Sequence, residues 1–479
     1  MAFSHLAAVS NSDVYVSWSD DEGATWRTPV PAAAGASNER SPSLIIGPGD
    51  DVTVFYAQDA DVTRVAYVRS SDRGATWATT TIALTPEVTR FGHPSFVANG
   101  PGAVGMYEAW CTEPKVCGTG AWTLDMLFLP DLSNASKWLG VYFAQTPDVE
   151  LFHPSTGFDA VSGDLVGAME IEINDGADYD LTWFRYNPTT AFFSQDALMC
   201  YRICGSTQRV WPSIAVEGER AVVGAVFSNA TFFGPDPVIL ANYSTNVSSG
   251  TWQGVNGGSQ RLGAPASDTG ALALTLDGSL VVAAYSAEGA TWNVTSLDGG
   301  ATFGPPVRVS DNLPGTAVGG PRGVAVAASS TRVFLAWEDR RDGDVNIYST
   351  SSRRIHSVVL STAPAGFLVR LDGGPAVTAP VSWNLLTGSD HVIEAVSPMP
   401  AGPGLRFVFK QWSDGNTSNP RTVLVTGDAT YVAEFTVVYW LELGSNPPRM
   451  GIGDGIMSAS GPRGWTPSAS VPPVRVTRP

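Results

Sequence analysis

An eight-residue motif of the form Ser-x-Asp-x-Gly-x-Thr-aromatic occurs three times in this chain of 479 residues, at 19–26, 70–77 and 296–303. The motif glycines Gly23 and Gly74 are 51 residues apart, and Gly300 follows 226 residues later, which is four steps of about 56. A repeat of this length predicts structural units that stack or close into a circle. Glycine permits a turn with positive φ, Asp, Ser and Thr satisfy turn amides, and an aromatic side chain fills space between sheets, so we expect a structural motif.

A second repeat, led by proline, runs through the same region. Its steps are 52, 60, 58, 53 and 56 residues, between Pro42, Pro94, Pro154, Pro212, Pro265 and Pro321. Each proline precedes two short apolar segments joined by a turn, and in complete units a third segment leads into the octapeptide motif. Four strands per unit at this period are typical of a propeller blade. The sequence therefore predicts an all-β fold with a six-bladed β-propeller over residues 1–355.

The two ends of this region are incomplete units. Residues 1–31 contain a third strand, the motif and a fourth strand, but no proline-led start. Residues 316–354 have the proline-led start but no motif. We expect the N-terminal and C-terminal segments to complete one shared closing blade.

The remaining quarter of the chain has a different pattern. Residues 363–437 alternate polar and apolar side chains around a turn at Trp412 and are predicted to form a small β-sandwich-like module. They resemble the β modules appended to bacterial and archaeal surface proteins, which implies attachment to a cell surface. Residues 438–479 are rich in Gly, Pro and Ser without a clear period, so we expect a flexible tail.

Composition limits the partners and the compartment. The formal net charge is −17, and binding to a nucleic-acid backbone needs a basic surface, so nucleic acid is excluded as a partner. No apolar run approaches the roughly 20 residues that span a bilayer. We expect a monomeric mature protein, extracellular or at the cell surface, without a signal peptide in this chain. The four cysteines form two close pairs, for which disulfides are favoured with three connectivities open, and they are Cys111, Cys117, Cys200 and Cys204.

The octapeptide and the proline repeat together resemble the Asp-box (BNR-repeat) propellers of the sialidase superfamily, over about residues 1–355. This superfamily includes glycosidases, other hydrolases and non-catalytic members, so the resemblance is more specific for the fold than for the activity. In a propeller, the starts of the innermost strands and the ends of the second strands meet at one face, around the central funnel, which is the default site.

The resemblance implies a secreted sialidase-like hydrolase that acts on an anionic glycan or a related small anionic substrate in the funnel, without a cofactor. Such enzymes hold the substrate carboxylate with arginines, use an Asp as acid/base, and use a Tyr nucleophile activated by a Glu. The residues here that match or could fill these catalytic roles are Arg40, Asp59, Asp61, Glu108, Glu170, Arg322 and Tyr348. Candidate substrate-binding residues at the same face are Tyr56, Tyr107, Trp211, Trp337 and Arg340.

Two further hypotheses come from the residues themselves. His93 and His153 occupy the same position, directly before the blade proline, in adjacent units, and with Glu108 or Glu170 they could bind a divalent metal such as zinc or calcium. The metal would activate water for hydrolysis of an ester or phosphoester. Alternatively, the histidines pack as Trp211 does in the next unit, and the funnel binds a glycan or a protein loop without catalysis.

Overall fold

The structure is a computed structural model. It describes residues 2–8, 11–59, 63–84, 90–111, 121–133, 139–142, 149–173, 178–199, 211–227, 237–253, 260–262, 270–310, 323–329, 331–402 and 405–439, with only the backbone described in parts of some strands. In these residues the regular structure is β-strand, with two short 3-10 turns, η1 (Pro48–Asp50) and η3 (Val247–Ser249). The described part of the chain contains no helix that is long and apolar enough to cross a membrane. The expected all-β class is confirmed.

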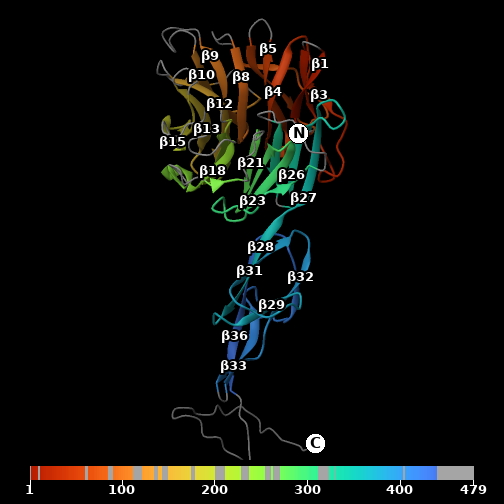
Figure 1. The fold of residues 1–479 in the computed structure, drawn as a ribbon, viewed down its shortest axis with the longest axis vertical. Coiled ribbons are helices and arrows are strands. Elements are labelled where there is room, and N and C mark those ends of the chain that lie inside the picture. Colours follow the sequence, from red (N-terminus) through yellow and green to blue (C-terminus); the bar gives the residue numbers. More distant parts are fainter. Residues whose placement is uncertain are drawn as a thin grey trace, which may run out of the picture. The chain divides into compact units, whose positions relative to one another are not determined.

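Seven antiparallel sheets follow one another along the described part of residues 1–353 (Figure 1). The first contains β1 (Ala2–Ala8), β2 (Asn11–Val16) and β3 (Val30–Ala33). The second contains β4 (Asn38–Ile46), β5 (Val52–Asp59), β6 (Thr63–Ser70) and β7 (Thr81–Leu84). The third contains β8 (Arg90–Asn99), β9 (Gly102–Cys111), β10 (Ala121–Leu129) and β11 (Leu139–Tyr142), and the fourth contains β12 (Val149–Asp159), β13 (Asp164–Ile173), β14 (Asp178–Asn187) and β15 (Phe192–Met199).

The last three sheets of this region continue the series. The fifth contains β16 (Ser213–Glu217), β17 (Arg220–Phe227), β18 (Val238–Asn246), β19 (Thr251–Gln253) and β20 (Gln260–Arg261). The sixth contains β21 (Leu272–Asp277), β22 (Leu280–Ala287), β23 (Ala290–Ser296) and β24 (Val307–Arg308), and the seventh contains β25 (Val324–Ala328), β26 (Arg332–Asp339) and β27 (Asn346–Arg353). Alternate apolar side chains of neighbouring sheets pack into shared clusters, for example between the second and third, the fourth and fifth, and the fifth and sixth sheets.

The first strands of the second to seventh sheets lie side by side, in the order β4, β8, β12, β16, β21 and β25. Residues from these six strands or their leading segments line one cavity of about 210 Å³. Sheets placed around a common axis in this way are the arrangement of a β-propeller. The proline repeat predicted these strands, because Pro42, Pro94 and Pro154 lie within β4, β8 and β12, and Pro212 directly precedes β16.

A serine after each of these four prolines connects one sheet to the next. The hydroxyl of Ser43 accepts a hydrogen bond from the amide of Phe96, at 3.0 Å. The same bond, also at 3.0 Å, joins Ser95 to the Thr156 amide, Ser155 to the Ile214 amide, and Ser213 to the Leu274 amide. The serine of one inner strand therefore accepts a hydrogen bond from a backbone amide of the inner strand in the next sheet. That amide needs an acceptor from outside its own sheet.

The octapeptide motif has the structural role expected from the sequence. In the second copy, Asp72 accepts bonds from the amide and the hydroxyl of Thr76, and the Ser70 hydroxyl accepts from the amide of Gly74, whose φ is +94°. The aromatic residue that ends this copy, Trp77, packs against the apolar cluster shared by the first and second sheets. The first and third copies repeat the same hydrogen bonds.

Among the described strands, the two ends of the propeller region do not share one sheet, which corrects the predicted closing blade and leaves the count of six blades unconfirmed. The first segment has its own strand β1 paired with β2, and β25 to β27 form a separate three-stranded sheet. The circle closes through side-chain contacts. A Cβ at motif glycine Gly23 would lie 3.2 Å from Phe334 of β26, and the Ser351 hydroxyl of β27 donates to the Glu22 carbonyl at 3.0 Å. The motif glycines Gly74 and Gly300 meet the preceding sheet in the same way.

The chain divides into two compact units, and the described residues of the second are 360–381, 392–402, 405–421 and 431–439. Beyond β27 the strands are β28 (Ile355–Ala363), β29 (Leu368–Leu371), β30 (Val377–Thr378), β31 (Val381–Leu386), β32 (Asp390–Ala395), β33 (Met399–Gly402), β34 (Leu405–Trp412), β35 (Arg421–Leu424) and β36 (Ala429–Tyr439). They form two sheets, in the orders β31-β28-β36-β34-β33 and β30-β29-β32-β35. Strand β36 extends to Tyr439, two residues into the segment predicted as tail, and residues 440–479 lie outside the described part.

Trp412 is the centre of the second unit. Its side chain is fully buried, and its indole N–H donates to the Ser418 carbonyl at 3.0 Å. The Arg421 guanidinium lies 5.4 Å from the indole ring and forms an ion pair with Asp414 at 2.7 Å. The Trp-Ser-Asp-Gly segment that marks this region in the sequence is thus a packed turn.

Candidate functional site

The residue before each of the four described blade prolines leaves the regular strand geometry, while Pro265 and Pro321 lie outside the described residues. Ser41, His93, His153 and Trp211 have φ values of +53°, +44°, +49° and +36°, in the left-handed region that side-chain-bearing residues rarely adopt. The strand pairing shifts register at the first three of them, which is the mark of a β-bulge. Left-handed backbone before proline is unfavourable by about 1–3 kcal/mol, and such outliers concentrate at functional sites.

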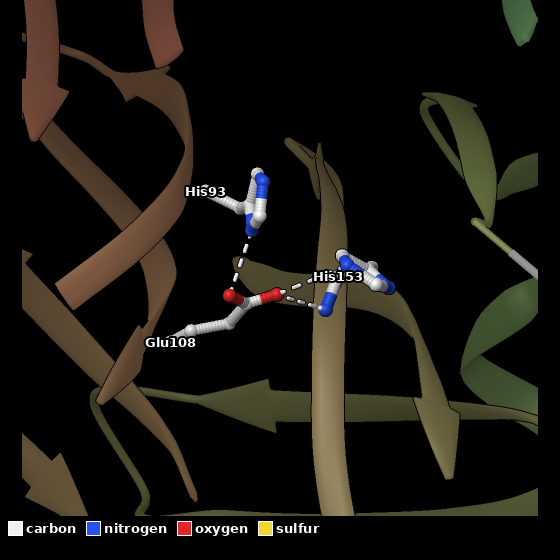
Figure 2. A group of neighbouring side chains, drawn as sticks. All are labelled: His93, Glu108 and His153. Atoms are coloured by element: carbon white, nitrogen blue, oxygen red, sulfur yellow. Dashed lines mark hydrogen bonds and ion pairs between the residues drawn. The ribbon is translucent and has the colours of Figure 1, made fainter. Parts of the chain in front are cut away.

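The bulges of β8 and β12 direct two histidines toward one carboxylate, Glu108 of β9 (Figure 2). His93 Nδ1 lies 2.7 Å from Glu108 Oε2, and His153 Nε2 lies 3.7 Å from Glu108 Oε1. The backbone amide of His153 donates to Glu108 Oε1 at 2.6 Å. One nitrogen or oxygen from each of these three side chains lies within 4.8 Å of the others. In the structure His93 and His153 therefore lie beside one carboxylate, and their use as metal ligands stays a prediction.

A second carboxylate and an indole complete the cluster. Glu170 of β13 has no exposed side-chain surface, and its Oε2 lies 3.2 Å from His153 Nδ1. The Trp211 ring is stacked on the His153 ring with centroids 3.2 Å apart, and it meets the His93 ring edge-on at 5.1 Å. His153 and Trp211 also line the axial cavity. The side chain of His93 is 26% exposed, so the cluster can be reached from solvent.

A missing Cβ makes room for the Glu108 carboxylate. Gly92 pairs directly with Glu108 across β8 and β9. A Cβ placed on Gly92 would lie 2.7 Å from Glu108 Oε2, closer than real Cβ atoms approach other atoms. Glycine at this position therefore permits the carboxylate to stand beside the two imidazoles.

The cluster concentrates charge in a buried place. Burial by itself raises the pKa of Glu108, but the hydrogen bond with His93, the charges of both imidazoles and the His153 amide together lower that pKa to about 2. Glu108 is thus a carboxylate. Two buried carboxylates, Glu108 and Glu170, need compensating positive charge, which either two imidazolium groups or one divalent cation with neutral imidazoles would supply.

The donor set fits a divalent metal of zinc type. Zinc is held by imidazole nitrogen and carboxylate oxygen at about 2.0–2.2 Å, which places neighbouring ligand atoms about 3.3 Å apart in a tetrahedron. His93 Nδ1 lies 2.7 Å from Glu108 Oε2 and His153 Nε2 lies 3.7 Å from Glu108 Oε1, and one donor atom from each of the three side chains lies within 4.8 Å of the others. Glu170 bonds the other nitrogen of His153, which fixes the imidazole orientation as carboxylates do behind metal-bound histidines.

Two of the residues assigned to a sialidase-like site, Glu108 and Glu170, belong to this cluster, whereas Arg40, Asp59 and Tyr348 have other partners. Arg40 forms an ion pair with Asp59, with Nε and Oδ2 2.8 Å apart. Tyr348 donates a short hydrogen bond to Asp342, which raises the pKa of the Tyr348 hydroxyl. None of these residues is among the described residues that line the axial cavity. Asp61 and Arg322 lie outside the described part of the chain, so their roles stay predictions.

Other predicted binding residues have structural surroundings. Tyr56 and Tyr107 are fully buried in the cores between sheets, and their hydroxyls bond to Thr80 and Asp125. Trp337 is buried beside Val324, and its indole N–H donates to Asp339. Arg340 is exposed at the end of β26. The side chains of Cys111, Cys117, Cys200 and Cys204 lie outside the described residues, so the predicted disulfides stay a prediction.

Comparison with known proteins gives similar chain traces at low identity. No protein-family model matches this chain, and neither does any curated protein. Similar solved structures include a Hadza microbial sialidase, with 12% identity and a TM-score of 0.45 over 72% of this chain and 74% of that one. A protein of unknown function from Dyadobacter fermentans has 11% identity and a TM-score of 0.48, over 66% and 95%. An ulvan lyase has 12% identity and a TM-score of 0.42, over 70% and 86%. At these identities and TM-scores, the activity of none of these proteins transfers to the chain.

Proposed function

We propose that this protein is a metal-dependent hydrolase whose site is the axial cavity of the propeller, with the metal held by His93, Glu108 and His153. The observation that carries the proposal is the convergence of two bulged histidines from adjacent sheets on one buried carboxylate. Three protein ligands leave the fourth position of a tetrahedral zinc ion open, which is the arrangement of catalytic rather than structural zinc.

The surroundings favour a metal over a pair of imidazolium ions. Glu170 faces Nδ1 of His153 and leaves Nε2 toward Glu108, so the imidazole is oriented with one nitrogen available as a ligand. Trp211 stacks on the same imidazole and restricts its rotation. An orientation fixed from two sides is what a metal ligand requires, because affinity depends on ligand geometry before the ion arrives.

When bound, the metal would supply a Lewis acid and a water molecule that is deprotonated near neutral pH. The residues of the chain hold and surround this chemistry. Glu108 would contribute the one negatively charged ligand, beside the two neutral imidazoles. Pro94, Pro154 and Trp211 line the cavity together with the serines that follow the blade prolines. A cavity of about 210 Å³ suits a small ester or phosphoester group, or the end of a larger substrate.

A sialidase-like glycosidase is the second candidate, and one observation favours it. The Tyr348 hydroxyl donates a hydrogen bond to Asp342, and the Arg341 guanidinium lies 4.0 Å from the Tyr348 ring. A tyrosine nucleophile would have a carboxylate base and a cation beside it in this arrangement. An anionic glycan substrate, secretion and surface attachment belong to this candidate as predictions. The six-bladed count stays unconfirmed, because the described ends form separate sheets.

The test measures metal content and activity together. Purified protein loaded with zinc and desalted is expected to retain about one ion per chain, and to hydrolyse a chromogenic ester or phosphoester only when loaded. His93→Ala and His153→Ala should lose the ion. His391→Ala is the matched control, because His391 lies in β32 of the C-terminal region and contacts Ser389 instead of the cluster.

Two results would decide against the metal site. The first is wild-type protein that retains no zinc, cobalt or manganese after loading while circular dichroism shows a folded β protein. The second is equal metal content in wild type, His93→Ala and His153→Ala. Hydrolysis of a fluorogenic sialoside that resists chelator and is abolished by Arg40→Ala would support the glycosidase candidate instead.

A further inference from the structure

A second group of buried carboxylates lies between the first and second sheets, away from the axial cluster. Asp13 in β2 is 7% exposed and Glu39 in β4 is 1% exposed. Their strands lie side by side, and the Ser12 hydroxyl donates to the Glu39 carbonyl at 3.2 Å. Two carboxyl groups are thereby brought into the same buried layer from separate sheets.

The hydrogen bonds to these carboxylates come from neutral groups. Gln58 Nε2 donates to Glu39 Oε1 at 3.2 Å, and Asn11 Nδ2 reaches Asp13 Oδ1 at 3.4 Å. Burial raises the pKa of Glu39, and bonds from Gln58 and the Gly35 backbone lower it. Asp13 raises that pKa through its charge and through a hydrogen bond that the two carboxyl groups share when one is protonated. When both acids are ionised they repel each other in a place with little solvent, and a proton or a cation must offset that repulsion.

Two oxygen atoms in the same group are buried without a hydrogen-bond partner. One is Glu39 Oε2 and the other is Asn11 Oδ1. Asn11 is held in place, because its Nδ2 donates to the Gly35 carbonyl at 2.9 Å. A buried acceptor without a donor is unfavourable by about 1–3 kcal/mol, and more when it is charged, so native proteins rarely leave one without a water or an ion.

We propose that Asp13, Glu39 and Asn11 form a binding site for a hard divalent cation such as calcium. The available atoms are all oxygens, from two carboxylates and one amide, and calcium takes such ligands together with carbonyls and waters. This donor set contrasts with the imidazole nitrogens of the axial cluster, which favour zinc. The cation would balance the two carboxylates and occupy both unpartnered oxygens. It would also join the first sheet to the second by direct ligation.

The experiment uses the full chain, stripped of metal with chelator and desalted. Calcium is titrated by calorimetry and by thermal unfolding, and magnesium is titrated in parallel. Wild type is expected to bind calcium and to unfold at a higher temperature in its presence. Glu39→Gln and Asp13→Asn keep the side-chain size and should weaken calcium binding roughly tenfold or more, since loss of outer-shell partners alone has effects of that size. His153→Ala should keep the calcium response, which separates this site from the axial cluster.

Two outcomes would overturn the proposal. One is wild-type protein whose unfolding temperature and heat signal do not respond to calcium. The other is a Glu39→Gln variant that responds to calcium as wild type does. If Glu39→Gln is more stable than wild type and neither binds calcium, the two acids share a proton instead, and the site is not a cation site. Asp13→Asn provides an independent variant should Glu39→Gln fail to fold.

Discussion

The orientation of His153 by Glu170 leads to a quantitative prediction for Glu170→Gln. The Glu170 side chain is completely buried, and its Oε2 lies 3.2 Å from His153 Nδ1, on the side of the imidazole away from Glu108. Glutamine has nearly the same shape, so the cavity lining should be preserved, but the negative charge behind the imidazole is lost. Removing a carboxylate behind a metal-bound histidine typically weakens metal binding 10–100-fold. We expect that range for zinc, which corresponds to about 1.4–2.7 kcal/mol.

The assay is competition for zinc against a chromophoric chelator at neutral pH, followed by kcat/KM for the loaded protein. The matched control is Glu219→Gln, because Glu219 is exposed in the turn after β16 and its substitution makes the same chemical change. Zinc affinity of Glu170→Gln within a factor of about two of both wild type and Glu219→Gln would refute the role given to Glu170. A loss of unfolding temperature without a loss of zinc affinity would assign Glu170 to stability alone.

Three further predictions concern the frame around the site. Gly92→Ala should displace the Glu108 carboxylate, because the new Cβ would lie 2.7 Å from Glu108 Oε2. We expect this variant to lose zinc retention while its circular dichroism still shows β-sheet. Zinc retention equal to wild type would contradict this prediction. Ser95→Ala leaves the buried Thr156 amide without its acceptor and should lower the free energy of unfolding by about 1–3 kcal/mol. The control Ser71→Ala changes an exposed serine and should alter the free energy of unfolding by less than about 0.5 kcal/mol. Equal denaturation midpoints for the two variants would show that the inter-sheet bond is unimportant. The hydrogen bonds from Thr25 and Thr76 lower the pKa of Asp21 and Asp72 from 3.8 to about 2. The resulting stabilisation is present above pH 4 and is lost as the pH falls toward 2. Thermal unfolding measured across that range should show a smaller decline of the unfolding temperature in the double variant Asp21→Asn/Asp72→Asn than in wild type.

Much of the fold could be predicted because its signals are periodic. The proline steps identified the inner strands, and the octapeptides located turns whose glycines adopt φ values from +83° to +96°. Counting failed at the ends, where pattern alone cannot show whether two incomplete units share a sheet. Strand β1 pairs with β2 and gives the first segment a sheet of its own. That outcome depends on contacts between residues more than 300 positions apart, such as Arg332 with Glu22.

The candidate site was predictable only in part. His93 and His153 stand at equal positions of adjacent repeats, so the sequence could suggest that they meet, and Glu108 was a candidate from the end of the neighbouring strand. Strand alternation could not show which side the histidines face, because the bulge at each of them breaks the two-residue period. Asp13 and Glu39 could not be predicted as a pair, because two isolated acids in separate strands form no recognisable sequence pattern. Only the packing of the two sheets brings them together.

The bulges at Ser41, His93 and His153 separate two requirements that a strand normally couples. Within a regular strand, changing which residue faces the funnel also changes what is buried on the opposite face. Ser41, His93, His153 and Trp211 stand outside that alternation, and they already include a hydroxyl, two imidazoles and an indole on one backbone geometry. These four positions are therefore natural places to redesign the chemistry of the funnel while the serine bonds and strand registers around them stay as they are.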